Sequence, residues 1–159
     1  MRAIAKSRCC TPGGAPYHWC DYVERDGTRV VENELDESLQ DGCATQYEYE
    51  VRRGEIEALK ARASGGELAS EDEILPVRRH PLLWELRWHF GGRPFRLYHS
   101  EPRAFPRLLL ALKYHWKWTD GSQEEIDRRQ ESEMDEAAGR HEDWELRHPD
   151  GSSRLAVDR

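Results

Sequence analysis

The chain has 159 residues, a length that suits one domain with its own core, and its formal net charge is −7. Six Trp, six Tyr and three Phe argue against a disordered chain, which would be poor in aromatic residues. No stretch approaches the roughly 20 apolar residues that span a bilayer. The N-terminus also lacks the apolar run of a secretory signal, so we expect a cytoplasmic protein.

Residues 1–16 are expected to form a flexible N-terminal arm. No Cys-x-x-Cys pair is present, and two adjacent cysteines do not easily share one tetrahedral metal site. We therefore expect free thiols, no metal and no cofactor, and the role of the four cysteines stays open. The residues considered and set aside as a metal site are Cys9, Cys10, His18, Cys20 and Cys43.

The first half of the chain predicts one strand and two helices. Residues 17–24 favour a strand that ends at the Asp26-Gly27 turn. Val31, Leu35 and Leu39, four apart, predict a helix that stops near Gly42. Residues 46–64 predict a second helix, so the two together indicate a helical hairpin.

The middle of the chain predicts a β-sheet. Residues 67–81 form either a loop or a short edge strand, because Pro76 and Pro81 limit regular pairing. Three strands are expected at 83–90, 94–100 and 107–118, the first two joined by a Gly91-Gly92 turn. Side chains two apart share a face, so one face of these strands is predicted to carry Arg87, Arg96, Tyr98, His115 and Lys117.

Charge follows the same division of the chain. Residues 78–118 hold nine Lys or Arg against two Glu, whereas 1–77 and 119–147 each carry a net −7. A basic centre of this kind favours contact with phosphates through counterion release. Two other interpretations remain open: the acidic segments cover the basic face within the chain, or the charges are ordinary solvated surface.

The last predicted element is a helix. Ser122-Gln123-Glu124-Glu125 is typical of a capping box, and the apolar stripe after it predicts a helix to about Ala138. Residues 141–159 are expected to be a disordered tail, with Trp144 and Leu146 as its apolar anchors.

Several short motifs, taken in order, resemble the RelE/ParE toxin superfamily and its HigB-like, phage-derived branch. They are Leu83-Trp84-Glu85-Leu86-Arg87, Pro94-Phe95-Arg96-Leu97-Tyr98 and the apolar strand from Leu108 to Lys117. The resemblance implies an α+β fold over residues 17–140: an antiparallel sheet of about four strands, an N-terminal helical hairpin and a C-terminal helix. Two departures stand out: Trp116-Lys117 replaces the usual pair of lysines, and Thr119-Asp120-Gly121 replaces Thr-Pro.

The resemblance also implies a function: the toxin of a type II toxin–antitoxin system, a ribosome-dependent, metal-independent mRNA endonuclease. Such an enzyme cleaves RNA by attack of the 2′-hydroxyl, and its partners are mRNA, the ribosome and a helix-turn-helix antitoxin. Nearby cations are expected to lower the pKa of His115 and Tyr98 and favour either as a base. The expected catalytic residues are Arg87, Arg96, Tyr98, His115 and Lys117, and the expected RNA-binding residues are Arg93, Lys113, Trp116 and Trp118.

Two alternatives stay open. A ParE-like topoisomerase inhibitor would act through protein contacts and would need neither His115 nor Tyr98. A catalytically inactive relative would act only as a binding module, which the missing lysine and the acidic flanks favour.

Overall fold

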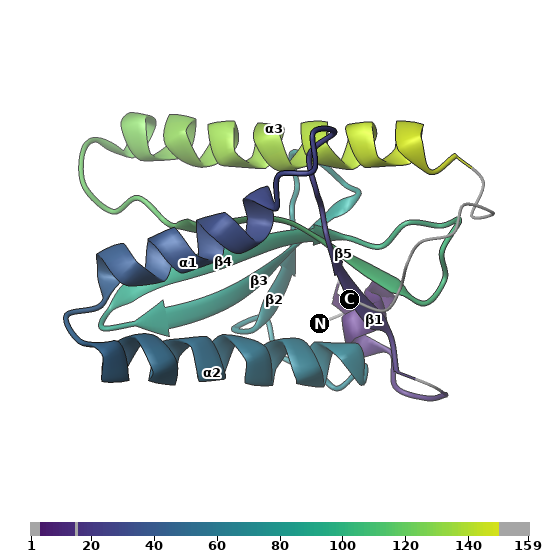
Figure 1. The fold of residues 1–159 in the computed structure, drawn as a ribbon, viewed down its shortest axis with the longest axis horizontal. Coiled ribbons are helices and arrows are strands. Elements are labelled where there is room, and N and C mark those ends of the chain that lie inside the picture. The colour runs from purple at the N-terminus through teal and green to yellow at the C-terminus, as the bar shows by residue number, and fades with distance from the viewer. Residues whose placement is uncertain (1–3, 15, 150–159) are drawn as a thin grey trace.

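The computed structural model describes residues 4–14 and 16–149 and confirms the α+β class. Figure 1 shows a layered arrangement in which α3 lies on one side of a twisted sheet and α2 on the other. The helices in chain order are the 3-10 helices η1 (Ile4–Lys6) and η2 (Arg8–Cys10), then α1 (Val30–Gly42), α2 (Gln46–Ser64) and α3 (Gln123–Arg147). The strands are β1 (His18–Asp21), β2 (Ile74–Pro76), β3 (Leu83–Phe90), β4 (Arg93–Ser100) and β5 (Leu108–Trp116).

The sheet differs from the antiparallel, four-stranded one that we expected. It has five strands in the order β1-β5-β4-β3-β2, and β1 runs parallel to β5 while the other neighbours are antiparallel. The parallel pair joins His18–Asp21 to residues 108–111, about ninety positions later in the chain. Local alternation predicts each strand but not a partner so far away, so the sequence pattern could not identify this pairing.

The apolar face of the sheet carries the main aromatic cluster. Phe95 is fully buried at its centre, with ring centroids 4.8 Å from Trp116 and 5.8 Å from Tyr114. Helix α2 contributes a cation over this cluster, because Lys60 Nζ lies 5.8 Å from the Tyr114 ring centroid. The buried members of the helices are Val31, Leu35 and Leu39 of α1, and Ile56, Leu59 and Ala63 of α2.

Helix α1 lies along the part of β5 that β1 does not reach. The backbone N–H of Tyr114 donates to Glu34 Oε1 at 3.4 Å, and the indole N–H of Trp116 donates to the Ser38 carbonyl at 2.8 Å. Close packing also explains why a small residue ends the helix: a Cβ on Gly42 would clash with the Trp116 ring. α1 is thereby fixed against the strand that carries His115.

Helix α3 begins as predicted but ends later. The Ser122 hydroxyl accepts from the Glu125 backbone N–H at 3.2 Å, and the helix then continues to Arg147 rather than to Ala138. Trp144 explains the extension, because it is buried and meets Phe105 edge-to-face at 5.1 Å between centroids. Residues 141–147 therefore belong to the folded domain, and the predicted disorder of 150–159 lies outside the described residues.

The N-terminal segment also differs from the flexible arm that we expected. Residues 4–14 pack on the domain, with Ile4 and Cys9 buried. The Arg8 guanidinium donates to three backbone carbonyls, those of Pro102, Phe105 and Leu108, at 2.6–3.0 Å. These bonds attach the segment to the loop before β5.

Within the described ranges, no helix combines the length and the apolar character needed to cross a membrane.

Candidate functional site

The charged residues predicted to share one face of the sheet do lie together on it. Strand pairing places Arg87 opposite Arg96, and Arg96 opposite His115. It also places Tyr98 opposite Lys113. The expected register is therefore confirmed, and this charged face lies beneath α3.

Arg96 is almost fully buried, and its charge is balanced within the sheet. Its side chain is 2% exposed, and its Nε lies 2.6 Å from Glu85 Oε1. Its Nη1 donates to the carbonyls of Phe95 and Trp88 at 3.0 and 3.3 Å. Burial lowers the pKa of Arg96, and Glu85 opposes that change, so the guanidinium stays charged.

His115 is buried beside Arg96 in a neutral form. Its Nδ1 lies 3.0 Å from the Trp116 carbonyl, which fixes the proton on that nitrogen and leaves a lone pair on Nε2. No residue in the described ranges hydrogen-bonds Nε2. Burial lowers the pKa of His115 to about 4, and the cations Lys113 and Arg96 add to the effect. The pKa of His115 is lowered, as we expected, but the main cause is burial and not the nearby cations.

Tyr98 behaves in the opposite way to the prediction. Burial and the nearby Glu85 carboxylate raise its pKa, so the phenol stays protonated at neutral pH. Its ring lies 5.1 Å from the His115 ring between centroids, and Gln130 and Glu133 of α3 face it. Tyr98 therefore carries its proton at neutral pH and does not act as the base.

Lys113 is enclosed by carboxylates from two helices. Its Nζ lies 3.1 Å from Glu34, 3.2 Å from Glu133 and 3.1 Å from Glu136. Burial by itself would lower the pKa of Lys113, but these carboxylates raise it above its usual value. The ammonium is charged and fully paired, so it is not presented to an RNA in this conformation.

Arg140 of α3 completes the cover over this end of the charged face. Its Nη2 pairs with Glu34 at 2.7 Å, and its Nη1 donates to the Leu112 carbonyl at 2.7 Å. Leu112 is the extra residue of β5 at a bulge opposite Tyr98 and His99. The bulge provides the carbonyl that holds α3 to the sheet.

The other predicted residues lie around the buried group. Arg87 is half-buried, lies 3.4 Å from Glu85 and donates to the Glu71 carbonyl at 3.0 Å. Lys117 is half-buried just past β5, where its backbone N–H donates to the Pro94 carbonyl. Both act on the buried pair through their charge: Arg87 helps to lower the pKa of Arg96, and Lys117 helps to lower that of His115.

The predicted RNA-binding residues do not form one surface. Trp116 packs on the apolar face against Phe95, with the Arg93 guanidinium 4.4 Å above its ring, so it is not available to stack on a base. Trp118 is 45% exposed, and Arg129 of α3 lies 4.3 Å above its ring. Of the two tryptophans, only Trp118 offers an exposed ring.

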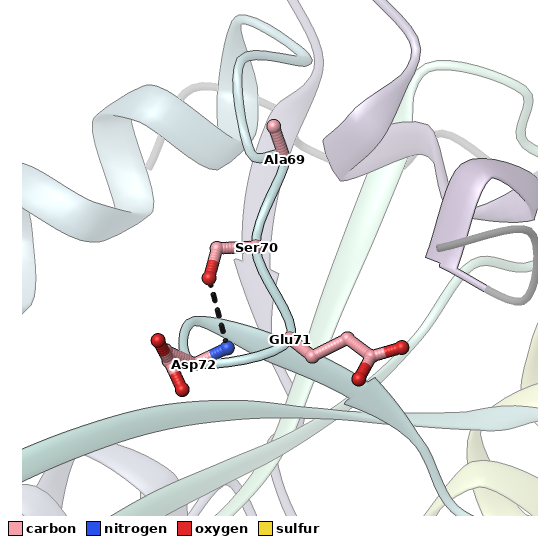
Figure 2. Close-up of a pocket in the computed structure, with 4 residues that line it drawn as sticks. All are labelled: Ala69, Ser70, Glu71 and Asp72. Atoms are coloured by element: carbon pink, nitrogen blue, oxygen red, sulfur yellow. Dashed lines mark hydrogen bonds between the residues drawn. The ribbon is translucent and has the colours of Figure 1, made fainter.

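A surface hollow lies elsewhere, on the loop before β2. Figure 2 shows its lining residues Ala69, Ser70, Glu71 and Asp72, with the carboxylates of Glu71 and Asp72 pointing to opposite sides of the loop. The Ser70 hydroxyl accepts from the Asp72 backbone N–H at 3.0 Å. This acidic hollow does not suit a phosphodiester.

Of the carboxylates that neutralise the charged face, the sequence pattern indicates one and gives no signal for the others. Glu85 was visible as the strand neighbour of Arg87, and alternation places it on the same face as Arg96. Glu34 and Glu133 come from distant helices and left no local signal near Lys113. The acidic segments do cover the basic face, one of the readings that the charge pattern left open.

Comparison of the chain with known protein families, with curated protein sequences and with solved structures finds no match.

Proposed function

We propose that the protein is a metal-independent endoribonuclease of the toxin type that cleaves mRNA on the ribosome and is restrained by a cognate antitoxin. The observation that carries this proposal is a neutral imidazole beside a guanidinium: His115, with a free Nε2 lone pair, directly opposite Arg96 in the sheet. Cleavage of RNA by its own 2′-hydroxyl needs a base of this kind and a cation at the phosphorus.

Each group has a defined part in the proposed reaction. His115 Nε2 accepts the 2′-hydroxyl proton while the 2′-oxygen attacks the adjacent phosphorus. Arg96, with Arg87 and Lys117, stabilises the negative charge of the phosphorane. The bond from phosphorus to the 5′-oxygen then breaks, and the phenol of Tyr98, which is protonated at neutral pH, donates to that oxygen. The products are a 2′,3′-cyclic phosphate and a 5′-hydroxyl.

Access is the second element of the proposal. Arg96 and His115 are both buried, so a phosphate does not reach them in this conformation, and we infer that α3 moves away from the charged face when RNA binds. Ion pairs fasten the middle of the helix, with Glu133 and Glu136 on Lys113 and Arg140 on Glu34, while Trp144 packs on Phe105 near its end. A phosphodiester carries negative charge, as these carboxylates do, and can replace them on the cations of the sheet.

A catalytically inactive binding module is the second candidate. Its support is that Arg96 and Lys113 are already paired with carboxylates of the chain itself. In that case the charged face stabilises the fold and a partner binds another surface.

The test is induction of the full chain in a bacterial host, with mapping of mRNA 5′ ends. Wild type is compared with His115→Gln and Tyr98→Phe. The matched controls are His89→Gln, at an exposed position of β3, and Tyr114→Phe, a buried tyrosine on the apolar face. Arg96→Ala is avoided because it leaves Glu85 buried without its partner.

We expect growth arrest and new 5′-hydroxyl ends within translated frames for wild type and both controls. His115→Gln lacks the proton acceptor, so the number of new 5′-hydroxyl ends should fall roughly 100-fold or more in this variant. Arrest without RNA cleavage would replace the proposal with topoisomerase inhibition. Normal growth with intact RNA would favour the binding module, and cleavage by a folded His115→Gln protein would exclude the proposed base.

A further inference from the structure

Three metal-ligating side chains converge on the other face of the sheet, away from His115. Cys9 comes from η2, His99 from β4 and Glu101 from the residue that follows β4. Cys9 and His99 are fully buried, and the Glu101 side chain is 9% exposed. The sequence analysis considered Cys9 only with the other cysteines and His18, because His99 and Glu101 lie about ninety residues away.

The spacing of the three donor atoms matches a tetrahedral zinc site. Cys9 Sγ lies 3.5 Å from His99 Nε2 and 3.8 Å from Glu101 Oε2, and the last two atoms are 3.1 Å apart. Zinc bond lengths and tetrahedral angles place sulfur, nitrogen and oxygen ligands about 3.4–3.6 Å from one another. The three separations lie within about 0.4 Å of these values, so small side-chain shifts bring the three atoms to three corners of a tetrahedron.

The surrounding residues hold the carboxylate in place. Glu101 Oε1 accepts from the Arg8 backbone N–H at 2.9 Å, and Oε2 accepts from the Ser7 hydroxyl at 2.6 Å. The Ser7 hydroxyl in turn accepts from the Cys9 backbone N–H at 3.0 Å. Hydrogen bonds from neighbouring residues to a ligating side chain orient the ligands of metal sites in this way.

Charge and donor chemistry select the ion. A thiolate and a carboxylate together carry −2, so a divalent cation makes this buried group neutral. Zinc binds sulfur and imidazole nitrogen well, whereas the hard cations calcium and magnesium prefer oxygen ligands. Without a cation, the Cys9 thiol and a His99 Nε2 proton can both point at Glu101 Oε2, whereas a cation accepts lone pairs from all three atoms.

We propose that Cys9 Sγ, His99 Nε2 and Glu101 Oε2 bind one Zn²⁺ ion that fastens the N-terminal segment to the sheet. Cys9 binds as a thiolate and releases its proton to solvent. A water molecule completes the four ligands. The site is structural, lies outside the charged face and does not depend on RNA cleavage.

Cobalt titration of the full chain, without an affinity tag, tests the site. Co²⁺ bound by a thiolate gives a charge-transfer absorption in the near ultraviolet that hydrated Co²⁺ lacks. We expect this band to saturate at one equivalent and to disappear on addition of Zn²⁺. Cys9→Ser and Glu101→Gln should weaken Co²⁺ binding at least tenfold, whereas Cys43→Ser, a half-buried thiol between α1 and α2, should bind as wild type does.

Thermal unfolding gives a second readout that does not need a folded variant. Zn²⁺ should raise the melting temperature of the metal-free wild type, and a chelator should reverse the rise. The proposal is overturned if folded wild type shows neither the thiolate band nor a zinc-dependent melting temperature. It is also overturned if Cys43→Ser loses the band while Cys9→Ser keeps it.

Discussion

The two faces of the sheet are both buried, but they are buried by different physical means. The apolar face is covered by rings and aliphatic side chains, with Phe95 at its centre. The charged face is covered by ion pairs, with Arg96 on Glu85 and Lys113 on three carboxylates. Apolar packing needs only area and fit, whereas each buried charge needs its particular partner. The comparison suggests that the first face stabilises the fold and that the second can exchange its partners for a ligand.

The largest loss of stability is expected from a substitution on the apolar face. Phe95→Ala removes a fully buried ring that contacts four other aromatic rings, and should lower the free energy of unfolding by about 5 kcal/mol, the upper end for such changes. Urea unfolding measures the loss, with Leu82→Ala at an exposed position as the control that should change little. A loss below about 2 kcal/mol would mean that the neighbouring rings close the cavity.

The charged face should respond differently to single and double substitutions. Glu85→Leu leaves the Arg96 guanidinium buried beside an apolar side chain and should cost about 3 kcal/mol. The double variant Glu85→Leu with Arg96→Leu removes both charges and should recover most of that stability. Chemical unfolding of the two single variants and the double variant gives the coupling energy. Additive losses would show that the two side chains do not compensate each other.

A smaller, pH-dependent effect is expected from His115. Its pKa is about 4 in the folded chain and near 6.5 when unfolded, so the unfolded state binds more protons between these values. Stability from this group is present above the unfolded pKa and is lost as the pH falls. We expect wild type to lose about 2 kcal/mol more than His115→Gln between pH 7 and pH 5. Equal pH profiles for the two proteins would show that His115 is not buried in its neutral form.

The sequence predicted the elements better than it predicted how they meet. Alternation in 83–90, 94–100 and 107–118 was enough to place Arg96 beside His115, because side chains in paired strands follow the period of two. The start of α3 after Ser122 follows from a local cap. These features depend on neighbours in the sequence.

The features that were missed depend on contacts between distant segments. β1 pairs with β5 in parallel, Trp144 extends α3 by packing on Phe105, and Cys9 is buried against His99. The partners of Lys113 were missed for the same reason. Its local sequence pattern is typical of a phosphate contact, yet Glu34 and Glu133, which come from two helices, neutralise its charge. Local patterns give the type of a side chain and its face, and only tertiary packing gives its partner.

The ends of the sheet have a consequence for how other proteins can bind. An exposed edge strand has unpaired backbone groups, to which a partner protein can hydrogen-bond a strand of its own. Here β1 has four residues, α1 covers the remainder of β5, and β2 has three residues that end at Pro76. Residues 87–90 of β3 extend past β2, and the Arg87 backbone N–H is already bonded to the Glu73 carbonyl. A protein partner would therefore find little backbone to pair with and is expected to recognise helix surfaces and side chains instead.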